Sequence, residues 1–202
     1  IEGGILGSVV PALTGRVLGA LQMLCSARFL TVGPGLKSGI KLRLDNPAQL
    51  GAELLCGAVA ALEEGPGPLA VISADTAISI MAVNAKQELV GGVILPGPQL
   101  SLSALVQRTA QLPQIDLSAP ASSSILGKNT SACLQNGFVL GTAGLLDGLA
   151  ERFQAELGPD IRFYATGNLP RTIREACRTP IEYREYLITD GLYRIWQKNR
   201  KG

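Results

Sequence analysis

LAVISADTAISIMAVNAKQELVGGVILPG, residues 69–97, is the stretch that decides the fold of this chain. An apolar run over residues 69–72 breaks at the small polar turn Ser73-Ala74-Asp75-Thr76-Ala77, and a second β-rich run follows over residues 78–83. A turn at Asn84-Ala85-Lys86 leads to a third run that ends at Pro96-Gly97. This alternation predicts a β-hairpin extended by a third strand. The turn at residues 73–77 fits an ordinary hairpin, and its small residues and hydroxyl groups also suit a phosphate contact.

The composition indicates a globular α/β protein. The chain has 202 residues, of which 47% are hydrophobic and 17% are charged, so it can bury a substantial core. The formal net charge of +2 gives no reason to expect nucleic acid as a partner, and the basic residues are scattered. The basic cluster at residues 198–201 is expected to be a frayed, solvated end. No apolar run reaches the roughly 18–20 residues that span a bilayer, so no membrane partner is expected.

The absence of histidine excludes several kinds of active site. Ser-His-Asp and Cys-His nucleophilic sites, histidine zinc sites and a histidine general base are all ruled out. Any acid–base chemistry must use Asp, Glu, Lys, Tyr or Cys. The four cysteines, Cys25, Cys56, Cys133 and Cys177, form no C-x-x-C pair and lie in apolar sequence. We therefore expect reduced core residues of a cytosolic protein.

Helical and extended patterns alternate along the rest of the chain, as α/β proteins require. Helices are expected over residues 13–24, 48–63, 99–111, 127–157, 169–177 and 187–199, and further strands over residues 1–10, 28–32, 40–44 and 161–164. Residues 165–168 are expected to form a turn, and residues 118–124 a polar linker. Gly65-Pro66-Gly67-Pro68 is the best candidate for a hinge between two lobes. The first lobe would comprise residues 1–67 with the C-terminal helix (189–202) packed back on it, and the second residues 68–188.

A series of short blocks covers nearly the whole chain and resembles the type III pantothenate kinases. The blocks are residues 32–39 (VGPGLKSG), Asp45-Asn46-Pro47, Gly51-Ala52, Gly91-Gly92, Pro96-Gly97, residues 109–113 (TAQLP), Gly127-Lys128-Asn129-Thr130, Thr166-Gly167, Gly191-Leu192 and Lys198-Asn199. They occur in the order and spacing of that family, which makes the series far more specific than any single motif.

The resemblance implies a two-lobed α/β fold, that of the actin-like ATPases (ribonuclease H-like). The first lobe is expected to be incomplete, because the family's opening strand and Asp-x-Gly-Asn phosphate turn have no counterpart in this sequence. The implied activity is ATP-dependent phosphorylation of pantothenate to 4′-phosphopantothenate, the first step of coenzyme A biosynthesis. The implied cofactors are Mg²⁺ and a monovalent cation, K⁺ or NH₄⁺, and the implied state is a cytoplasmic homodimer.

The resemblance also assigns residues to the pantothenate site. The family's Gly-Ala-Asp-Arg block reads Gly51-Ala52-Glu53-Leu54, so Glu53 would take the place of the catalytic aspartate. The longer side chain of Glu53 shifts its carboxylate by about 1 Å, which can cost on the order of 100-fold in rate. Leu54 takes the place of the family's arginine, and its side chain cannot donate the paired hydrogen bonds that a guanidinium offers to a polar substrate. Leu44 stands where the family has tyrosine.

The nucleotide and cation positions also depart from the family pattern. The second phosphate turn, Asp-x-Gly-Thr-Ala in the family, here places Ser73 at the monovalent-cation position and Asp75 at the turn glycine. Ser73 lacks a charge for a cation, and Asp75 sets a negative charge near the ATP phosphates. Thr76 matches as an ATP contact and Thr130 as a substrate contact, while the late Thr-Gly-Gly reads Thr166-Gly167-Asn168.

Three interpretations follow from these matches and departures. The chain is a pantothenate kinase with full or impaired activity, a non-catalytic relative that binds a ligand or regulatory partner, or a decaying gene product that keeps its fold without a function. Nucleotide binding without turnover would distinguish the second interpretation from the first.

Overall fold

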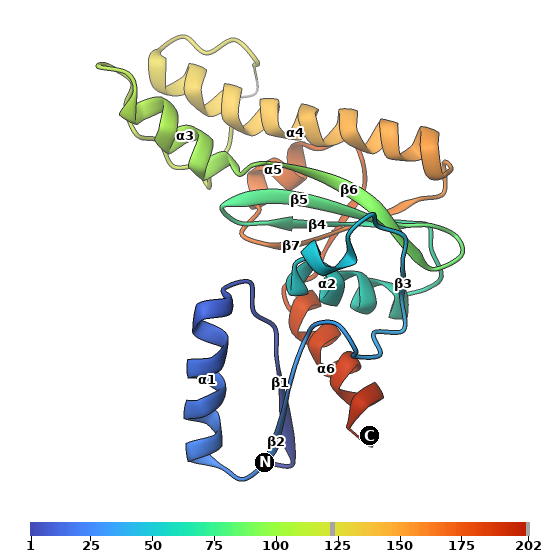
Figure 1. Cartoon of the computed structure of the whole chain (residues 1–202). Coiled ribbons are helices and arrows are strands. Elements are labelled where there is room, and N and C mark those ends of the chain that lie inside the picture. The colour runs from blue at the N-terminus through green and yellow to red at the C-terminus, as the bar shows by residue number, and fades with distance from the viewer. Residues whose placement is uncertain (122–123, 201–202) are drawn as a thin grey trace.

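A computed structural model of the chain describes residues 1–121 and 124–200 (Figure 1). The helices are α1 (Pro11–Leu24), α2 (Ala52–Glu63), α3 (Pro98–Gln107), α4 (Thr130–Leu157), α5 (Arg171–Ala176) and α6 (Leu187–Asn199), with a short 3-10 helix, η1, at Pro47–Gln49. The strands are β1 (Gly3–Leu6), β2 (Arg28–Thr31), β3 (Lys41–Leu42), β4 (Leu69–Ala74), β5 (Ala77–Val83), β6 (Glu88–Pro96), β7 (Arg162–Gly167) and β8 (Ile181–Tyr183). Residues 122–123 of the expected linker, and residues 201–202 at the C-terminus, lie outside the described residues.

The main sheet has six strands in the order β3-β6-β5-β4-β7-β8. Strands β4, β5 and β6 pair in antiparallel fashion, which confirms the predicted three-stranded hairpin. Strand β7 pairs in parallel with β4, and β8 pairs in parallel with β7. A ribonuclease H-like sheet has this arrangement. Three strands pair in antiparallel fashion, and two further strands run parallel to the first of them and lie beside it. The α/β fold class is therefore confirmed.

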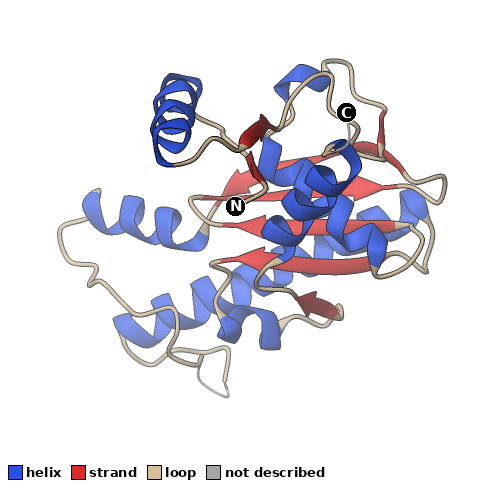
Figure 2. Cartoon of the chain, turned by 90° about the horizontal axis from the view of Figure 1, so that it is seen from below, coloured by secondary structure: helices blue, strands red, loops and turns tan. Residues whose placement is uncertain are grey.

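Helices cover both faces of this sheet. Leu69 and Val71 of β4 pack with α2 and α6 in one apolar cluster, whereas Ala70 and Ile72 pack with α4 and α5 in the other. Figure 1 shows α4 above the sheet and α2 with α6 below it, and Figure 2 shows helices crossing in front of the strands when seen from below. All six residues of β4 are buried. This explains why its sequence is continuously apolar rather than alternating.

Helix α2 begins later than the sequence pattern predicted. The expected helix over residues 48–63 is divided into η1 and α2, because Gly51 has extended backbone angles (φ −59°, ψ 136°). Asn46 caps η1 by accepting a hydrogen bond from the Ala48 N–H at 3.2 Å. Close packing of α2 on α6 depends on Gly191, where any Cβ would collide with the carbonyl of Cys56.

The N-terminal elements form a separate small sheet, in which β1 and β2 pair in parallel. Figure 1 shows β1, β2 and α1 beside α6, away from the six-stranded sheet. The predicted helix over residues 13–24 forms, but its apolar residues Leu13, Val17 and Leu24 are 49%, 41% and 82% exposed. Periodicity correctly predicted the helix but not what lies beside it.

Several other boundaries differ from the sequence-based expectation. The expected strand over residues 1–10 is limited to β1, and that over residues 40–44 to β3. Residues 165–167 belong to β7 rather than to a turn, because β4 continues to pair with them. Strand β8 was not predicted, since three residues are too few to show a period. Helix α6 has the predicted bounds, so Lys198 and Asn199 are helical and not part of a frayed end.

The cysteines are all free thiols, but they are not all core residues. Cys56 is buried and Cys133 is exposed, whereas Cys25 and Cys177 are partly buried. Within the part of the chain that the structure describes, none of the helices combines the length and apolar character that crossing a bilayer requires.

Asp147 on α4 holds the segment that follows α5. Its side chain is 5% exposed and accepts hydrogen bonds from the backbone N–H groups of Arg178 at 3.0 Å and Thr179 at 2.9 Å. Burial disfavours the charged form of this carboxyl, but the hydrogen bonds from Arg178 and Thr179 outweigh that effect and lower its pKa. Because the pKa is lower in the folded state, the stabilisation is present at neutral pH and is lost as the pH falls below about 4.

We predict that Asp147→Asn lowers the free energy of unfolding by about 2 kcal/mol at pH 7, because an amide donor then faces the donors of Arg178. Urea unfolding from pH 7 to pH 3 measures the effect, and the difference from the wild type should shrink toward pH 3. Glu151→Gln is the matched control, since Glu151 lies 3.7 Å from Arg178 and is 68% exposed. Equal stability of Asp147→Asn and Glu151→Gln at pH 7 would contradict this role.

Candidate active site

Two turns meet at the edge of the sheet where β4 and β7 end. The parallel register sets Ser73 opposite Thr166 and Ala74 opposite Gly167. Beyond the paired residues, the Asn168 N–H donates to the Ala74 carbonyl, and Asn168 Nδ2 donates to Asp75 Oδ1 at 3.0 Å. The predicted phosphate turn and the late Thr-Gly-Asn segment are therefore one structural unit.

The β6–α3 junction completes this edge. Gly97 N–H donates to the carbonyl of Thr76 at 2.9 Å, and Asp75 N–H donates to the carbonyl of Ala77 at 2.9 Å. The side chains of Asp75 and Thr76 are exposed at the tip of the turn. A hydroxyl and a carboxylate are thus presented together to solvent, whereas the Asp75, Gly97 and Asn168 N–H groups donate to carbonyls within the joined turns.

Three hydroxyl groups lie in register across the adjoining strands. Ser79 on β5 and Thr166 on β7 flank Ser73 on β4, and all three are at most 9% exposed. Thr166 Oγ1 donates to the carbonyl of Glu185 at 3.4 Å. The row is on the sheet face that packs against α2 and α6. It offers neutral oxygens only, and the described residues contain no group of three His, Cys, Asp or Glu side chains that could hold a metal ion.

The first turn of α2 carries the block that was expected to bind substrate and supply the base. Gly51 is the N-cap, Ala52 is buried and Glu53 is exposed in the first turn. A carboxylate is stabilised there by the helix dipole. Leu54 is 8% exposed and belongs to the apolar cluster beneath the sheet, and Leu44 packs against the same cluster. The side chains of Leu44 and Leu54 therefore contribute to the packing of the hydrophobic core.

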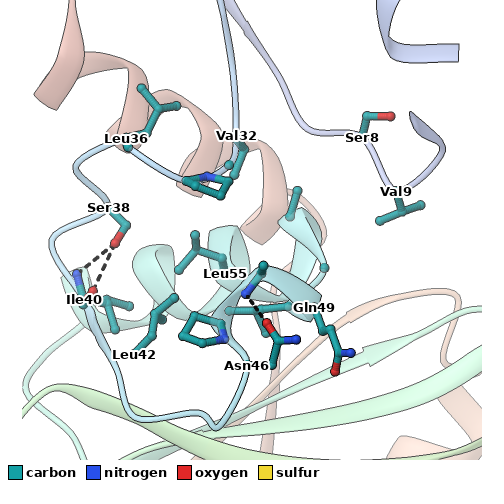
Figure 3. A pocket seen from close by; sticks show the side chains of 18 residues that line it. Ser8, Val9, Val32, Leu36, Ser38, Ile40, Leu42, Asn46, Gln49 and Leu55 are labelled. Atoms are coloured by element: carbon teal, nitrogen blue, oxygen red, sulfur yellow. Dashed lines mark hydrogen bonds between the residues drawn. The ribbon is translucent and has the colours of Figure 1, made fainter. Parts of the chain in front are cut away.

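A cavity of about 770 Å³ opens beside this turn (Figure 3). Its walls are the loop between β2 and β3, the segment from Asn46 to Ala52, and Ser8 with Val9 from the β1–α1 connection. None of the described residues that line it is charged. Figure 3 shows Ser38 hydrogen-bonded to the backbone of Ile40, which the contacts at 3.1 and 3.2 Å confirm. The cavity combines apolar walls with a few hydroxyl and amide groups, as small-molecule sites commonly do.

Glu53 borders a second, smaller cavity of about 190 Å³. This space lies between α2, α6 and the β1–α1 connection, and it shares Ser8, Val9 and Ala52 with the larger cavity. Cys56 also lines it, but burial raises the pKa of that thiol to about 12, so it stays protonated and cannot act as a base at neutral pH. Glu53 is the one carboxylate among the lining residues of the two cavities, taken over the described chain.

The structure brings some of the predicted site residues together and separates others. Gly51 and Ala52 line the large cavity with Glu53 next to them. Thr76 lies in the turn between β4 and β5, whereas Ser73, which was expected in the same turn, is part of β4. Thr130 is the first residue of α4, on the opposite face of the sheet from α2. Sequence reasoning missed Ser8 and Gln49 as lining residues. No local pattern marks Ser8 or Gln49, although family-like blocks flank Gln49 at residues 45–47 and 51–52.

Comparison with known proteins gives consistent results along the chain. A family model described as type III pantothenate kinase matches residues 1–152. A type III pantothenate kinase of Koribacter versatilis is 37% identical over 99% of this chain and 72% of its own length. Another, from an Exiguobacterium species, is 35% identical over 100% of this chain and 78% of its own length.

A solved structure also shares the fold. The crystal structure of a conserved Campylobacter jejuni protein, assigned to the Baf family of transcriptional activators, superposes with a TM-score of 0.59. The match covers 98% of this chain and 83% of the other, at 18% sequence identity. At that identity the likeness supports the fold alone.

Gly167 is predicted to be essential to the joined turns, because its φ is +81° and a Cβ would lie 2.3 Å from the carbonyl oxygen of Ala74. Gly167→Ala should lower the free energy of unfolding by about 3 kcal/mol. Gly15→Ala in α1 is the control, since nothing lies within 4 Å of a Cβ there, and it should stabilise the chain by about 0.5–1 kcal/mol. Thermal unfolding of the two variants measures both effects, and an unchanged melting temperature for Gly167→Ala would refute the geometry.

Proposed function

This chain belongs to the type III pantothenate kinase family, whose members are ATP-dependent kinases, and from that premise we propose that it is itself a working pantothenate kinase. The proposed reaction transfers the γ-phosphoryl group of ATP to the primary hydroxyl of pantothenate. The observation that carries the proposal is the cavity of about 770 Å³, which is lined by two family-like blocks, the loop after β2 and the start of α2.

Pantothenate would occupy this large cavity. Gly51 and Ala52 would contact it through the backbone, while Ser8, Asn46 and Gln49 supply polar groups along the wall. Leu44 and Leu54, at two family substrate positions, would contribute only indirectly by packing behind the wall. The volume lies within the range of about 300–1,000 Å³ that small-molecule sites occupy.

ATP would place its phosphates against the turn between β4 and β5. Thr76 offers an exposed hydroxyl there, while the Asp75 and Gly97 N–H groups stabilise the turn by donating to carbonyls within it. Asp75 is exposed at the same turn, and its negative charge opposes that of the phosphates unless a cation lies between them. The hydrogen bond from Asn168 restrains the Asp75 side chain, which would then lie beside the phosphates.

Glu53 would act as the general base. Glu53 is exposed on the first turn of α2 and borders the smaller cavity, which shares Ser8, Val9 and Ala52 with the larger one. From there its carboxylate would accept the proton of a substrate hydroxyl. Phosphoryl transfer otherwise depends on positioning and charge neutralisation, which the turn and the cavity would provide.

The two implied cations fit this chain differently. Mg²⁺ needs few protein ligands, since it usually binds through one or two carboxylates together with substrate phosphates, and Asp75 is a carboxylate in the right region. Mg²⁺ would neutralise phosphate charge during transfer. The K⁺ or NH₄⁺ position does not fit as well, because Ser73 and its neighbours present neutral hydroxyls. We therefore assign no step of the reaction to a monovalent cation.

The active form is proposed to be a cytoplasmic homodimer that pairs through α4. Leu145 is 44% exposed on this helix, and Gly137, Gly141, Gly144 and Gly148 have open space where a Cβ would lie. Thr130 at the start of α4 would then meet substrate bound by the partner subunit. The division into residues 1–67 with 189–202 and residues 68–188 is likewise proposed as the two lobes of the kinase.

A non-catalytic binding role is the second candidate. The observation that favours it is that Glu53 borders the smaller cavity rather than the wall of the larger one. In this role the chain would bind pantothenate or nucleotide without turnover.

We predict that the purified chain phosphorylates pantothenate with ATP and Mg²⁺, and that Glu53→Gln lowers kcat by about 100-fold or more, because the base is lost. Radiolabel transfer from ATP to pantothenate measures the rate. Glu63→Gln, a change at the last residue of the same helix, is the control and should leave the rate unchanged.

Pantothenate binding without phosphorylation in the wild-type chain would support the non-catalytic role instead. Equal turnover by the wild type and Glu53→Gln would show that the chain is a kinase and that its general base is a residue other than Glu53. The assay therefore separates the assignment of the base from the assignment of the activity.

We also predict that Leu145→Glu converts the homodimer to a monomer, because the two charges would be buried against each other at the α4 contact. Sedimentation velocity at several protein concentrations measures the state. Leu126→Glu, at another exposed leucine, is the control and should remain dimeric. A monomeric wild type, or a dimeric Leu145→Glu variant, would exclude pairing through this face.

A further inference from the structure

The last residue of α6 is hydrogen-bonded to the loop that lines the large cavity. Asn199 Oδ1 accepts from the Lys37 N–H at 3.0 Å, and Asn199 Nδ2 donates to the Lys37 carbonyl at 3.0 Å. The same Nδ2 donates to the carbonyl of Ile195 at 2.7 Å, which fixes the amide on its own helix. One side chain thus satisfies both polar groups of a residue that lies 162 positions away in sequence.

The loop held in this way forms much of the cavity wall. Gly33, Pro34, Gly35, Leu36 and Ser38 all line the cavity, whereas the exposed Lys37 does not. Clamping the Lys37 backbone therefore fixes the residues on either side of it without blocking the space they enclose.

Few other hydrogen bonds could hold this loop in place. Leu36 N–H bonds within the loop to Gly33 at 3.3 Å, and Ser38 bonds to Ile40 nearby. Over the described residues, the hydrogen bonds that join positions 33–38 to a different element all come from α6, with Lys198 Nζ contributing one to the Ser38 carbonyl at 3.4 Å. Asn199 makes two hydrogen bonds to the Lys37 backbone, and each is shorter than the one from Lys198 to Ser38. Asn199 therefore contributes most of the restraint on the loop.

We propose that Asn199 is a positioning residue, which holds the loop at residues 33–38 in the shape that receives the substrate. The inference rests on the proposed function, because it takes the large cavity as the pantothenate site. Asn199 itself touches no substrate. By restraining the loop before the ligand binds, Asn199 reduces the conformational entropy that the loop loses on binding.

The test compares Asn199→Ala with the wild type and with Gln197→Ala as the matched control. Gln197 is an amide on the same helical turn, and it bonds to Arg194 of its own helix at 3.4 Å rather than to the loop. Pantothenate binding is measured by calorimetry, and steady-state KM and kcat are measured for pantothenate and ATP. Hydrogen exchange of the peptide spanning residues 33–39 reports the loop directly, whether or not the chain is active.

Asn199→Ala should weaken pantothenate binding about tenfold, since it loses two hydrogen bonds that are each worth about a factor of two to ten. The KM for pantothenate should rise similarly, while kcat and the KM for ATP change less than twofold. Exchange in the loop should speed up, and Gln197→Ala should match the wild type in every measurement. Asn199→Asp, which keeps an acceptor for the Lys37 N–H but loses the donor, should give intermediate values.

Three results would overturn the inference, and they are distinguishable. If the wild type binds pantothenate and Asn199→Ala binds it equally well, Asn199 is not a positioning residue and the proposed function stands. If the wild type does not bind pantothenate at millimolar concentration, the proposed function fails, and this inference fails with it. A fall in kcat and in ATP affinity as large as the loss of pantothenate binding would indicate general destabilisation and would also count against it.

Discussion

The parallel pairing of β4 with β7 is the constraint on which the rest of the structure depends. Strand β4 is buried on both faces and also pairs with β5, so its register is fixed from two sides. A slip of one residue would turn its apolar side chains to the wrong faces. Because the strands are parallel, their ends lie at one edge, and the turns that follow them must meet there.

Helix α2 is the element that positions the residues proposed to bind and deprotonate the substrate. It packs on the sheet through a buried face and is pressed against α6 at Gly191. Its first turn therefore has a fixed position, and with it Gly51 and Glu53. The β1–α1 connection and the loop after β2 then enclose the large cavity beside that turn. The site is assembled from segments that are distant in sequence but rigidly connected through the sheet and its helices.

The residues that depart from the family pattern become understandable in this setting. Leu54 and Leu44 pack in or against the apolar cluster, so leucine suits these positions whether or not substrate binds. Ser73 belongs to a row of buried hydroxyls, which is compatible with a dry sheet face but provides no charge. These changes favour stability of the α2 side of the sheet over polar contacts. The lining of the large cavity is correspondingly uncharged among the described residues.

The sequence predicted the strongly patterned elements well, and it predicted the site in part. The hairpin at residues 69–97 and helix α6 carry clear periodic or turn signals, and both have the expected form. Strand β8 and the end of β7 depend on pairing with distant strands, which no local pattern records. The exposed face of α1 shows the same limit, since periodicity reveals an apolar face but not its neighbour. For the site, family-like blocks indicated Gly51 and Ala52, whereas the walls supplied by Ser8 and by the loop held by Asn199 depend on tertiary packing.

The most direct test of the account is a crystal structure of the chain with pantothenate and a non-hydrolysable ATP analogue. The account predicts pantothenate in the cavity between the loop after β2 and the start of α2, with its primary hydroxyl toward Glu53. It also predicts the nucleotide phosphates against the turn between β4 and β5. Pantothenate bound at any other place, or phosphates away from that turn, would contradict it.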